Sequence, residues 1–419
     1  MPKLSYFSSR RRVLLGGIGL LAAPSIVHAQ SANGVALIIG NSKYKWEASL
    51  PNAKRDATDI AQQFEALGLK TELLIDASRE SMVQALNRLK AAASGARLAV
   101  FYFAGHGVDW DKKDYLVPVD SDLSDPNTVG SLLETRIVRD SLWGASNRMA
   151  IFDNCRNNPA DGWRQTEAQR RAAASGAATT FNETKGSVLA LYSTAPGNIA
   201  LDGPAGQNSP FAAALLRQLK TPQVSFLSLV TGIRREILIA TKGKQLVFDR
   251  TLADYTFPQM NQKARGAQLA PAPTHDGYRV VEIPKAYEFA QKNAMPLPSG
   301  LIVIQQDQGS TASHKVGSFK TELKNRYGIT PALVVVLSSA ESGTASVIHC
   351  VARGFNGKPA WRFFQGAASG NKIKLLSRVQ ESETFVLEWQ SDNRGTFSSE
   401  PSAVSQQSIL VSHAMTRLD

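Results

Sequence analysis

Apolar runs of strand length alternate with segments of helical periodicity between residues 34 and 257. Such alternation predicts parallel β-α-β units with right-handed crossovers. The first part of the chain is therefore predicted to be an α/β domain with a mainly parallel sheet. The predicted strands are 34–40, 69–75, 97–103, 149–153, 186–192 and 245–248, and the predicted helices are 52–67, 81–89, 131–143, 211–219 and 226–240.

The pattern changes after a proline-bearing stretch, Gln-Leu-Ala-Pro-Ala-Pro at 268–273. Beyond it, short β-type runs are separated by Gly, Ser and Asn turns, which is typical of an all-β domain. We therefore expect a domain over 33–262, a linker over 263–298, and a smaller β-rich accessory domain of unknown role over 299–419. The β-type runs lie at 301–304, 332–337, 345–351, 360–364 and 384–389.

The amino terminus has the pattern of an export signal over residues 1–29. Three consecutive arginines at 10–12 precede an apolar run over 13–26, and Val-His-Ala at 27–29 gives a cleavage pattern. The paired arginines resemble a twin-arginine signal, so a periplasmic or otherwise exported protein is expected. An amino-terminal membrane anchor is the alternative, but the run is short and rich in glycine and alanine for a span. No other stretch predicts a transmembrane segment.

The charge of the chain bears on its possible partners, and its cysteine content bears on possible disulfides. The formal net charge is +12, part of which belongs to the cations of residues 1–29. No basic run is interleaved with aromatic residues, so no nucleic-acid partner is expected. The two cysteines, Cys155 and Cys350, allow one disulfide on arithmetic alone. The other interpretation makes Cys350 a small buried residue of a strand and leaves Cys155 free.

Two predicted strands end abruptly in polar, reactive residues. Ala99–Ala104 leads into Gly-His-Gly with His106 at its centre, and Met149–Asp153 leads into Asn154 and Cys155. In open α/β sheets, catalytic groups lie just past the carboxyl ends of the strands. Two neighbouring parallel strands would therefore hold an imidazole and a thiol side by side.

A thiol and an imidazole together suit nucleophilic catalysis. A cysteine attacks a carbonyl as its thiolate, and a histidine can take the thiol proton and return it to a leaving group. The backbone amides of Gly107 and Cys155 are candidates for an oxyanion hole. The plainer interpretation is a core cysteine and an unrelated loop histidine.

The flanking motifs resemble the caspase-like cysteine peptidases, and most closely the bacterial metacaspase-like (orthocaspase) members. The resemblance runs from about residue 34 to 257 and implies a caspase-like α/β/α sandwich with a His106/Cys155 dyad that cleaves peptide bonds. The motifs are Leu-Ile-Ile-Gly-Asn at 37–41, Leu-Pro-Asn-Ala-Lys-Arg-Asp-Ala at 50–57, Tyr-Phe-Ala-Gly-His-Gly at 102–107, Tyr-Leu-Val-Pro-Val-Asp at 115–120, Asp-Asn-Cys-Arg-Asn-Asn-Pro at 153–159, Ser-Thr-Ala-Pro-Gly at 193–197 and Asn-Ser-Pro-Phe at 208–211.

The resemblance also implies a preference for the residue before the scissile bond (P1). It places Asp153 and Asp56 in the S1 pocket, where two carboxylates would favour arginine or lysine. For Asp56 the alternative is an acid on a helix surface. The segment Ser193, Thr194 and Ala195 would pair with the substrate as a strand edge.

Two further features stay open at this level. The polar segment 157–185 holds Arg164, Arg170, Arg171 and Lys185, so it is either a site of self-cleavage or a solvated loop. No cofactor is expected to be required, although metacaspase relatives are often calcium-dependent. The candidate calcium ligands are Asp111, Asp114, Asp120, Asp122 and Asp125, whose spacing is not that of an EF-hand.

The sequence therefore predicts an exported cysteine endopeptidase that cleaves proteins or peptides after basic P1 residues. One rival is a catalytically silent caspase-fold scaffold or binding protein in the cell envelope. The second rival keeps the nucleophile and acts as an acyl transferase on an envelope amide. Neither the oligomeric state nor the physiological substrates follow from the sequence.

Overall fold

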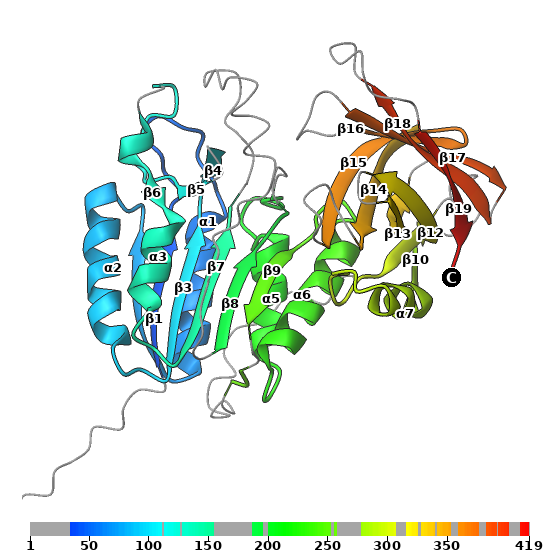
Figure 1. The fold of residues 1–419 in the computed structure, drawn as a ribbon. Helices are drawn as coiled ribbons and strands as arrows, with labels where there is room; N and C mark the ends of the chain where they lie inside the picture. The colour runs from blue at the N-terminus through cyan, green and yellow to red at the C-terminus, as the bar shows by residue number, and fades with distance from the viewer. Residues whose placement is uncertain are drawn as a thin grey trace, which may run out of the picture. The chain divides into compact units, whose positions relative to one another are not determined.

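The computed structural model has a six-stranded sheet at its centre, in the order β2-β1-β3-β7-β8-β9 (Figure 1). The first five strands are parallel and β9 is antiparallel to β8. The strands are β1 (Gly34–Gly40), β2 (Leu69–Ile75), β3 (Leu98–Ala104), β7 (Asn147–Asp153), β8 (Ser187–Tyr192) and β9 (Phe248–Leu252). The structure describes residues 34–110, 113–125, 128–154, 187–195, 200–252, 255–257, 278–306, 316–325, 328–339, 342–352, 359–376, 383–391, 393–401 and 411–418.

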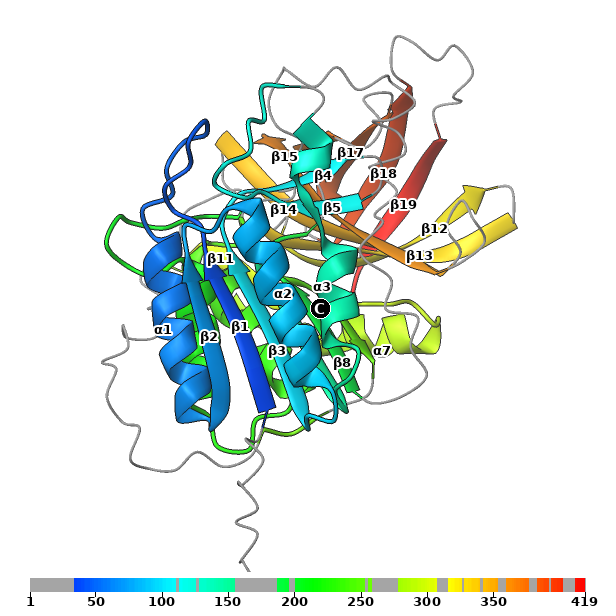
Figure 2. The ribbon, with the colours of Figure 1, turned by 90° about the vertical axis from the view of Figure 1, so that its left-hand side faces the viewer.

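Helices cover both faces of this sheet. One face packs on α1 (Ala53–Ala66), α5 (Pro210–Leu219) and α6 (Phe226–Ala240), and the other packs on α2 (Arg79–Ala93) and α3 (Thr135–Leu142). Figure 2 shows α2 and α3 in front of the strands. Alternate residues of β3 enter the two cores, since Tyr102 packs with α1 and α5 whereas Phe101 and Phe103 pack with α2 and α3. The predicted α/β fold with a mainly parallel sheet is confirmed.

Two elements differ from the sequence prediction. The last strand begins at Phe248 instead of residue 245, since the backbone N–H of Gln245 donates to the Thr241 hydroxyl at the end of α6 instead of to a neighbouring strand. The predicted helix over 131–143 begins only at Thr135. The residues before it form a 3-10 turn, η1 (Thr128–Ser131), and the strand β6 (Leu133–Glu134). That strand belongs to a small sheet with β4 (Gly107–Trp110) and β5 (Lys113–Leu116).

The carboxy-terminal region contains a closed eight-stranded barrel preceded by a short mixed segment. Residues of the range 263–298, which the sequence leaves as a linker, form β10 (Tyr278–Val281) and α7 (Pro284–Lys292), and β11 (Val303–Gln306) pairs with β10. Pro284 opens α7, and Ala286 and Ala290 form its buried face. The barrel strands are β12 (Gly317–Asn325), β13 (Gly328–Ser339), β14 (Ser342–Val351), β15 (Ala360–Ser369), β16 (Lys372–Leu376), β17 (Glu383–Ser391), β18 (Arg394–Pro401) and β19 (Val411–Arg417).

Strand β13 is buried on both sides. Val334 and Val336 belong to the core inside the barrel, whereas Leu333, Val335 and Leu337 pack with α7, β11 and the end of α6. The described residues between 34 and 418 belong to one compact unit of the chain. None of the described helices is both long and apolar enough to cross a membrane.

Candidate active site

The carboxyl ends of the parallel strands β1, β3 and β7 lie side by side at one edge of the sheet. Gly40 of β1 and Asp153 of β7 are both register partners of Ala104 of β3. His106 lies two residues beyond Ala104, and Asn154 follows Asp153. Cys155, the predicted nucleophile, comes next in the chain and lies outside the described residues. The structure thus brings His106 beside the carboxyl end of β7, which precedes Cys155 in the chain.

Two contacts fix the imidazole of His106. Its Nε2 lies 2.8 Å from the carbonyl oxygen of Ala48, and its ring packs at 4.5 Å, centroid to centroid, against the Tyr44 ring, with the two planes tilted by 53°. Because a carbonyl only accepts hydrogen bonds, Nε2 carries the proton and Nδ1 is left as the basic nitrogen. The backbone N–H of His106 also donates to the Tyr44 hydroxyl at 2.7 Å. This tautomer is the one that can accept a thiol proton through Nδ1.

Gly105, the residue before His106, lies where there is no room for a side chain. A Cβ atom on Gly105 would lie 2.6 Å from the Tyr44 hydroxyl and 2.7 Å from the Phe103 ring. The expected close approach of backbone beside His106 is therefore present on this side. Gly107, the candidate oxyanion residue, begins β4 directly after His106.

The loop that carries Ala48 is anchored at its base. The Asp76 carboxylate accepts the backbone N–H groups of Ser42 and Lys43, both at 2.8 Å. The Asn41 side chain donates to the carbonyl of Val117 and accepts the N–H of Ala77 at 2.9 Å. Sequence reasoning missed this anchoring, since the groups come from separate loops and mostly act through the backbone.

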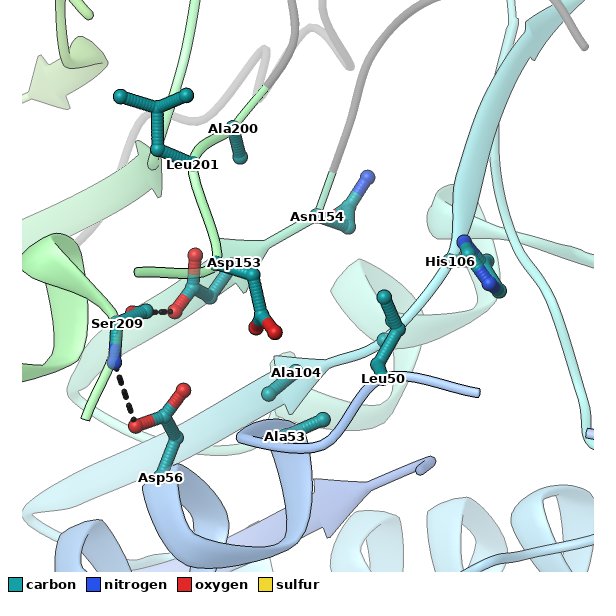
Figure 3. A pocket seen from close by; sticks show the side chains of 12 residues that line it. Leu50, Ala53, Asp56, Ala104, His106, Asp153, Asn154, Ala200, Leu201 and Ser209 are labelled. Carbon is teal, nitrogen blue, oxygen red and sulfur yellow. Dashed lines mark hydrogen bonds between the residues drawn. The ribbon is translucent and has the colours of Figure 1, made fainter. Parts of the chain in front are cut away.

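Both predicted S1 acids are buried and converge on one residue. Asp56 is 1% exposed at the start of α1 and Asp153 is 8% exposed at the end of β7. Ser209 joins them, as its N–H donates to Asp56 Oδ1 at 3.1 Å and its hydroxyl donates to Asp153 Oδ2 at 2.8 Å (Figure 3). The amide of Asn208 also donates to Asp56 Oδ1, at 3.0 Å. The alternative of a surface acid at Asp56 is excluded by its burial.

Asp56 and Asp153 line one pocket together with His106 (Figure 3). Burial raises the pKa of Asp56 to about 8, and the charge of Asp153 adds to the rise. Burial likewise raises the pKa of Asp153 to about 6, against the hydrogen bond from Ser209. Two buried carboxyls resist being ionised at the same time, and a cation bound beside them would stabilise their ionised forms. The pocket is therefore suited to a guanidinium or an ammonium group.

A third acid, Asp202, lines the same pocket and was not anticipated from the sequence. Its charge raises the pKa of both Asp56 and Asp153. The side chain of Asn52 holds the segment around Asp202, donating to the carbonyls of Asp202 at 2.8 Å and Pro204 at 3.0 Å. Asn52 lies in the motif at 50–57, so the signal was present without a role attached to it.

We expect Asp56→Asn to stabilise the fold at pH 8 and to change it little at pH 4. Both donors to Asp56 meet Oδ1, which asparagine keeps. A carboxyl whose pKa is raised from 3.8 to about 8 binds more protons folded than unfolded between those pH values. The unfolding free energy therefore falls as pH rises through this window, and asparagine removes that loss. The expected gain at pH 8 is about 2–4 kcal/mol, measured by denaturant unfolding at both pH values.

Asp59 provides a matched control for this substitution. It lies one turn after Asp56 on α1 and also accepts from Asn208, at 2.9 Å, but it does not line the pocket. Asp59→Asn should show no gain that grows with pH. Equal unfolding free energies for Asp56→Asn and wild type at pH 8 would contradict the raised pKa.

The remaining predicted residues have mixed outcomes. Ser193, Thr194 and Ala195 follow β8 and are buried, and none lines the pocket, so their role as a substrate edge stays a prediction. The segment 157–185 lies outside the described residues, as does Asp111. Among the described residues no group of three or more His, Cys, Asp or Glu side chains could hold a metal ion. Cys350 is a buried free thiol on β14, as its strand context predicts.

Comparison with known proteins identifies the family. A family model described as the caspase domain (Peptidase_C14) matches residues 33–257. Among solved structures, caspase-1 from Spodoptera frugiperda is similar over 52% of this chain and 88% of that chain, with 14% sequence identity and a TM-score of 0.38. A search of curated proteins found no match. Since the family model covers more than half of the sequence, the chain belongs to the caspase family of peptidases.

Proposed function

We propose that this chain is a cysteine endopeptidase that cleaves proteins after arginine or lysine with a His106/Cys155 dyad. Its caspase domain implies a cysteine peptidase acting on protein substrates. The observation that carries the finer proposal is the pocket in which the buried acids Asp56 and Asp153 lie together with His106.

The proposed reaction uses the tautomer of His106 described above. Nδ1 takes the proton of the Cys155 thiol, and the sulfur attacks the P1 carbonyl carbon while its π electrons move to the oxygen. The amides of Gly107 and Cys155 stabilise this oxyanion. The C–N bond then breaks as His106 returns the proton to the leaving amine. Water hydrolyses the remaining thioester and releases Cys155, again with His106 as the base.

The acid pair supports a P1 cation over a P1 aspartate. An aspartate side chain would bring a further negative charge to a pocket lined by Asp56, Asp153 and Asp202, where burial already opposes the ionisation of all three acids. A guanidinium would instead meet carboxylates already oriented by Ser209 and Asn208, with two parallel hydrogen bonds available to it.

Initial rates on fluorogenic peptides ending in Arg, Lys or Asp test this proposal. We expect cleavage after Arg and Lys by the wild-type chain and none by Cys155→Ala. Cleavage after Asp would keep the thiol mechanism and overturn the role of the two acids. A folded wild-type chain that cleaves no peptide would favour the scaffold, and transfer of the acyl group to an added amine without net hydrolysis would favour the acyl transferase.

Export, self-processing and metal independence complete the proposal. The signal-like residues 1–29 support a periplasmic or otherwise exported enzyme. Arginines 164, 170 and 171 in the segment after Cys155 are candidate cleavage sites for the enzyme itself, so wild type but not Cys155→Ala should be cut there.

Peptidase activity should persist in excess EGTA, and a strict need for added calcium would reveal ligands outside the described residues.

A further inference from the structure

A buried glutamine, Gln245, joins Ser193, which follows β8, to Leu201, which lines the pocket of the candidate active site. We call Ser193–Ala195 together with Leu201 the substrate-binding wall. Its side-chain Nε2 donates to the carbonyl oxygen of Ser193 at 2.8 Å, and its Oε1 accepts the backbone N–H of Leu201 at 3.0 Å. Ser193 begins the predicted substrate-binding edge after β8, and Leu201 lines the pocket beside Asp202. Gln245 is 1% exposed, so water does not compete for these two bonds.

Gln245 is itself held by the end of α6. Its backbone N–H donates to Thr241 Oγ1 at 3.1 Å, and that hydroxyl donates to the carbonyl of Ile237 at 2.7 Å. Leu246 and Val247, which follow it, are fully buried. The glutamine therefore has a fixed backbone and a side chain with both ends of its amide engaged.

Residues on both sides of Gln245 contact the carboxy-terminal barrel. The carbonyl of Lys244 accepts the side-chain amide of Gln365, and Phe248 packs at 5.5 Å, centroid to centroid, against Trp361, both partners belonging to β15. Leu246 shares a hydrophobic core with residues of β13 and β14. The segment that carries Gln245 thus packs between the peptidase sheet and the barrel.

We propose that Gln245 is a positioning residue for the substrate-binding wall, and that the docked barrel fixes it in place. The accessory domain is then part of the active peptidase, because displacing residues 243–248 moves the carbonyl of Ser193 and the amide of Leu201. This inference rests on the proposed function, since the wall matters only if Ser193–Ala195 and the pocket bind substrate. Gln245 touches neither substrate nor reacting atoms in this role.

Gln245→Met tests the positioning role directly. Methionine has a similar length and volume but makes neither hydrogen bond, so the wall loses its two anchors. We expect KM for a P1-arginine peptide to rise about tenfold while kcat changes less than about threefold, because the dyad is untouched. The matched control is Gln218→Met, which removes the bond from Gln218 to Glu236 on the α5–α6 pair and should leave KM unchanged.

The contribution of the barrel is tested with a clash and its relief. A Cβ on Gly243 would lie 2.5 Å from the Oγ and 2.9 Å from the Cβ of Ser338 on β13, so Gly243→Ala should push the two apart and raise KM about fivefold. Adding Ser338→Gly in the same chain removes both atoms and should restore KM. Gly95→Ala controls for backbone strain, since Gly95 has φ +76 against +75 at Gly243 and nothing near its Cβ.

The outcomes separate this inference from the proposed function. If wild type cleaves basic peptides but Gln245→Met keeps the wild-type KM, the positioning role is overturned and the peptidase proposal stands. If Ser338→Gly fails to restore Gly243→Ala, the barrel does not act through this contact and that part is overturned. If Gln245→Met does not fold, the Gly243 and Ser338 variants decide the question. A folded wild-type chain without any cleavage overturns both proposals.

Discussion

Asp153→Asn is expected to lower kcat/KM for peptides with arginine at P1 by about 10²–10³-fold. Asparagine keeps an oxygen that can accept the Ser209 hydroxyl, so the pocket retains its shape. The pocket loses the charge that a buried guanidinium would meet most directly beside the nucleophile, and an unpaired buried cation is costly. The loss should lie mainly in KM if the acid binds arginine equally in the ground and transition states.

Citrulline at P1 separates charge recognition from damage to the site. Citrulline has nearly the shape of arginine without its charge, so wild type should prefer arginine strongly and Asp153→Asn should nearly abolish that preference. Asp59→Asn, which alters a neighbouring acid outside the pocket, should keep the wild-type preference. An Asp153→Asn chain that is slow on arginine yet still prefers it over citrulline would show that Asp153 acts only on the structure.

The sequence predicted the site at the level of strand ends. When a buried strand ends at a reactive side chain, the position of that side chain is largely determined, because it follows from the register of the neighbouring parallel strands. Ala104 and Asp153 are register partners, so His106 and the chain leading to Cys155 emerge side by side. Asp56 depended on the family resemblance, since its helical position alone gives no sign of burial.

The sequence could not predict contacts made through the backbone or between distant loops. The carbonyl of Ala48 meets His106 across 58 positions, and any residue type offers a carbonyl. Asp202 lies in a glycine- and proline-rich stretch whose path depends on Asn52. Gln245 was predicted to begin a strand, but its backbone N–H donates to the Thr241 hydroxyl instead of joining a ladder, and its side chain bonds to Ser193 and Leu201. In each case tertiary contacts outweigh the local pattern.

The barrel illustrates the same limit in the accessory region. Four of its strands, β13, β14, β15 and β17, contain apolar runs that the sequence shows, whereas β12, β16, β18 and β19 carry many polar residues. Closure into a barrel pairs every strand on both edges, so a strand with one apolar face suffices. Its contacts with residues 243–248 come from side chains of β13, β14 and β15 that no motif marks, so the link between the barrel and the pocket appears only in the structure.

His106→Gln is expected to lower kcat/KM about 10³-fold and to slow the alkylation of Cys155 by iodoacetamide at pH 6. Glutamine can still donate to the Ala48 carbonyl but cannot take a proton from the thiol at the position of Nδ1. Without that base, Cys155 should react like an ordinary cysteine, whose thiol has a pKa of about 8.5. The two chains should therefore differ most at pH 6 and converge above about pH 9.

Cysteine content makes this measurement clean. The only other cysteine, Cys350, is fully buried, and burial raises its pKa to about 12. Alkylation of the native protein therefore reports on Cys155 alone, and the Cys155→Ala chain should label only after unfolding. Equal alkylation rates of wild type and His106→Gln at pH 6 would show that the imidazole does not activate the thiol. In that case His106 would be retained for its packing against Tyr44, and the chain would be better explained as a caspase-fold scaffold.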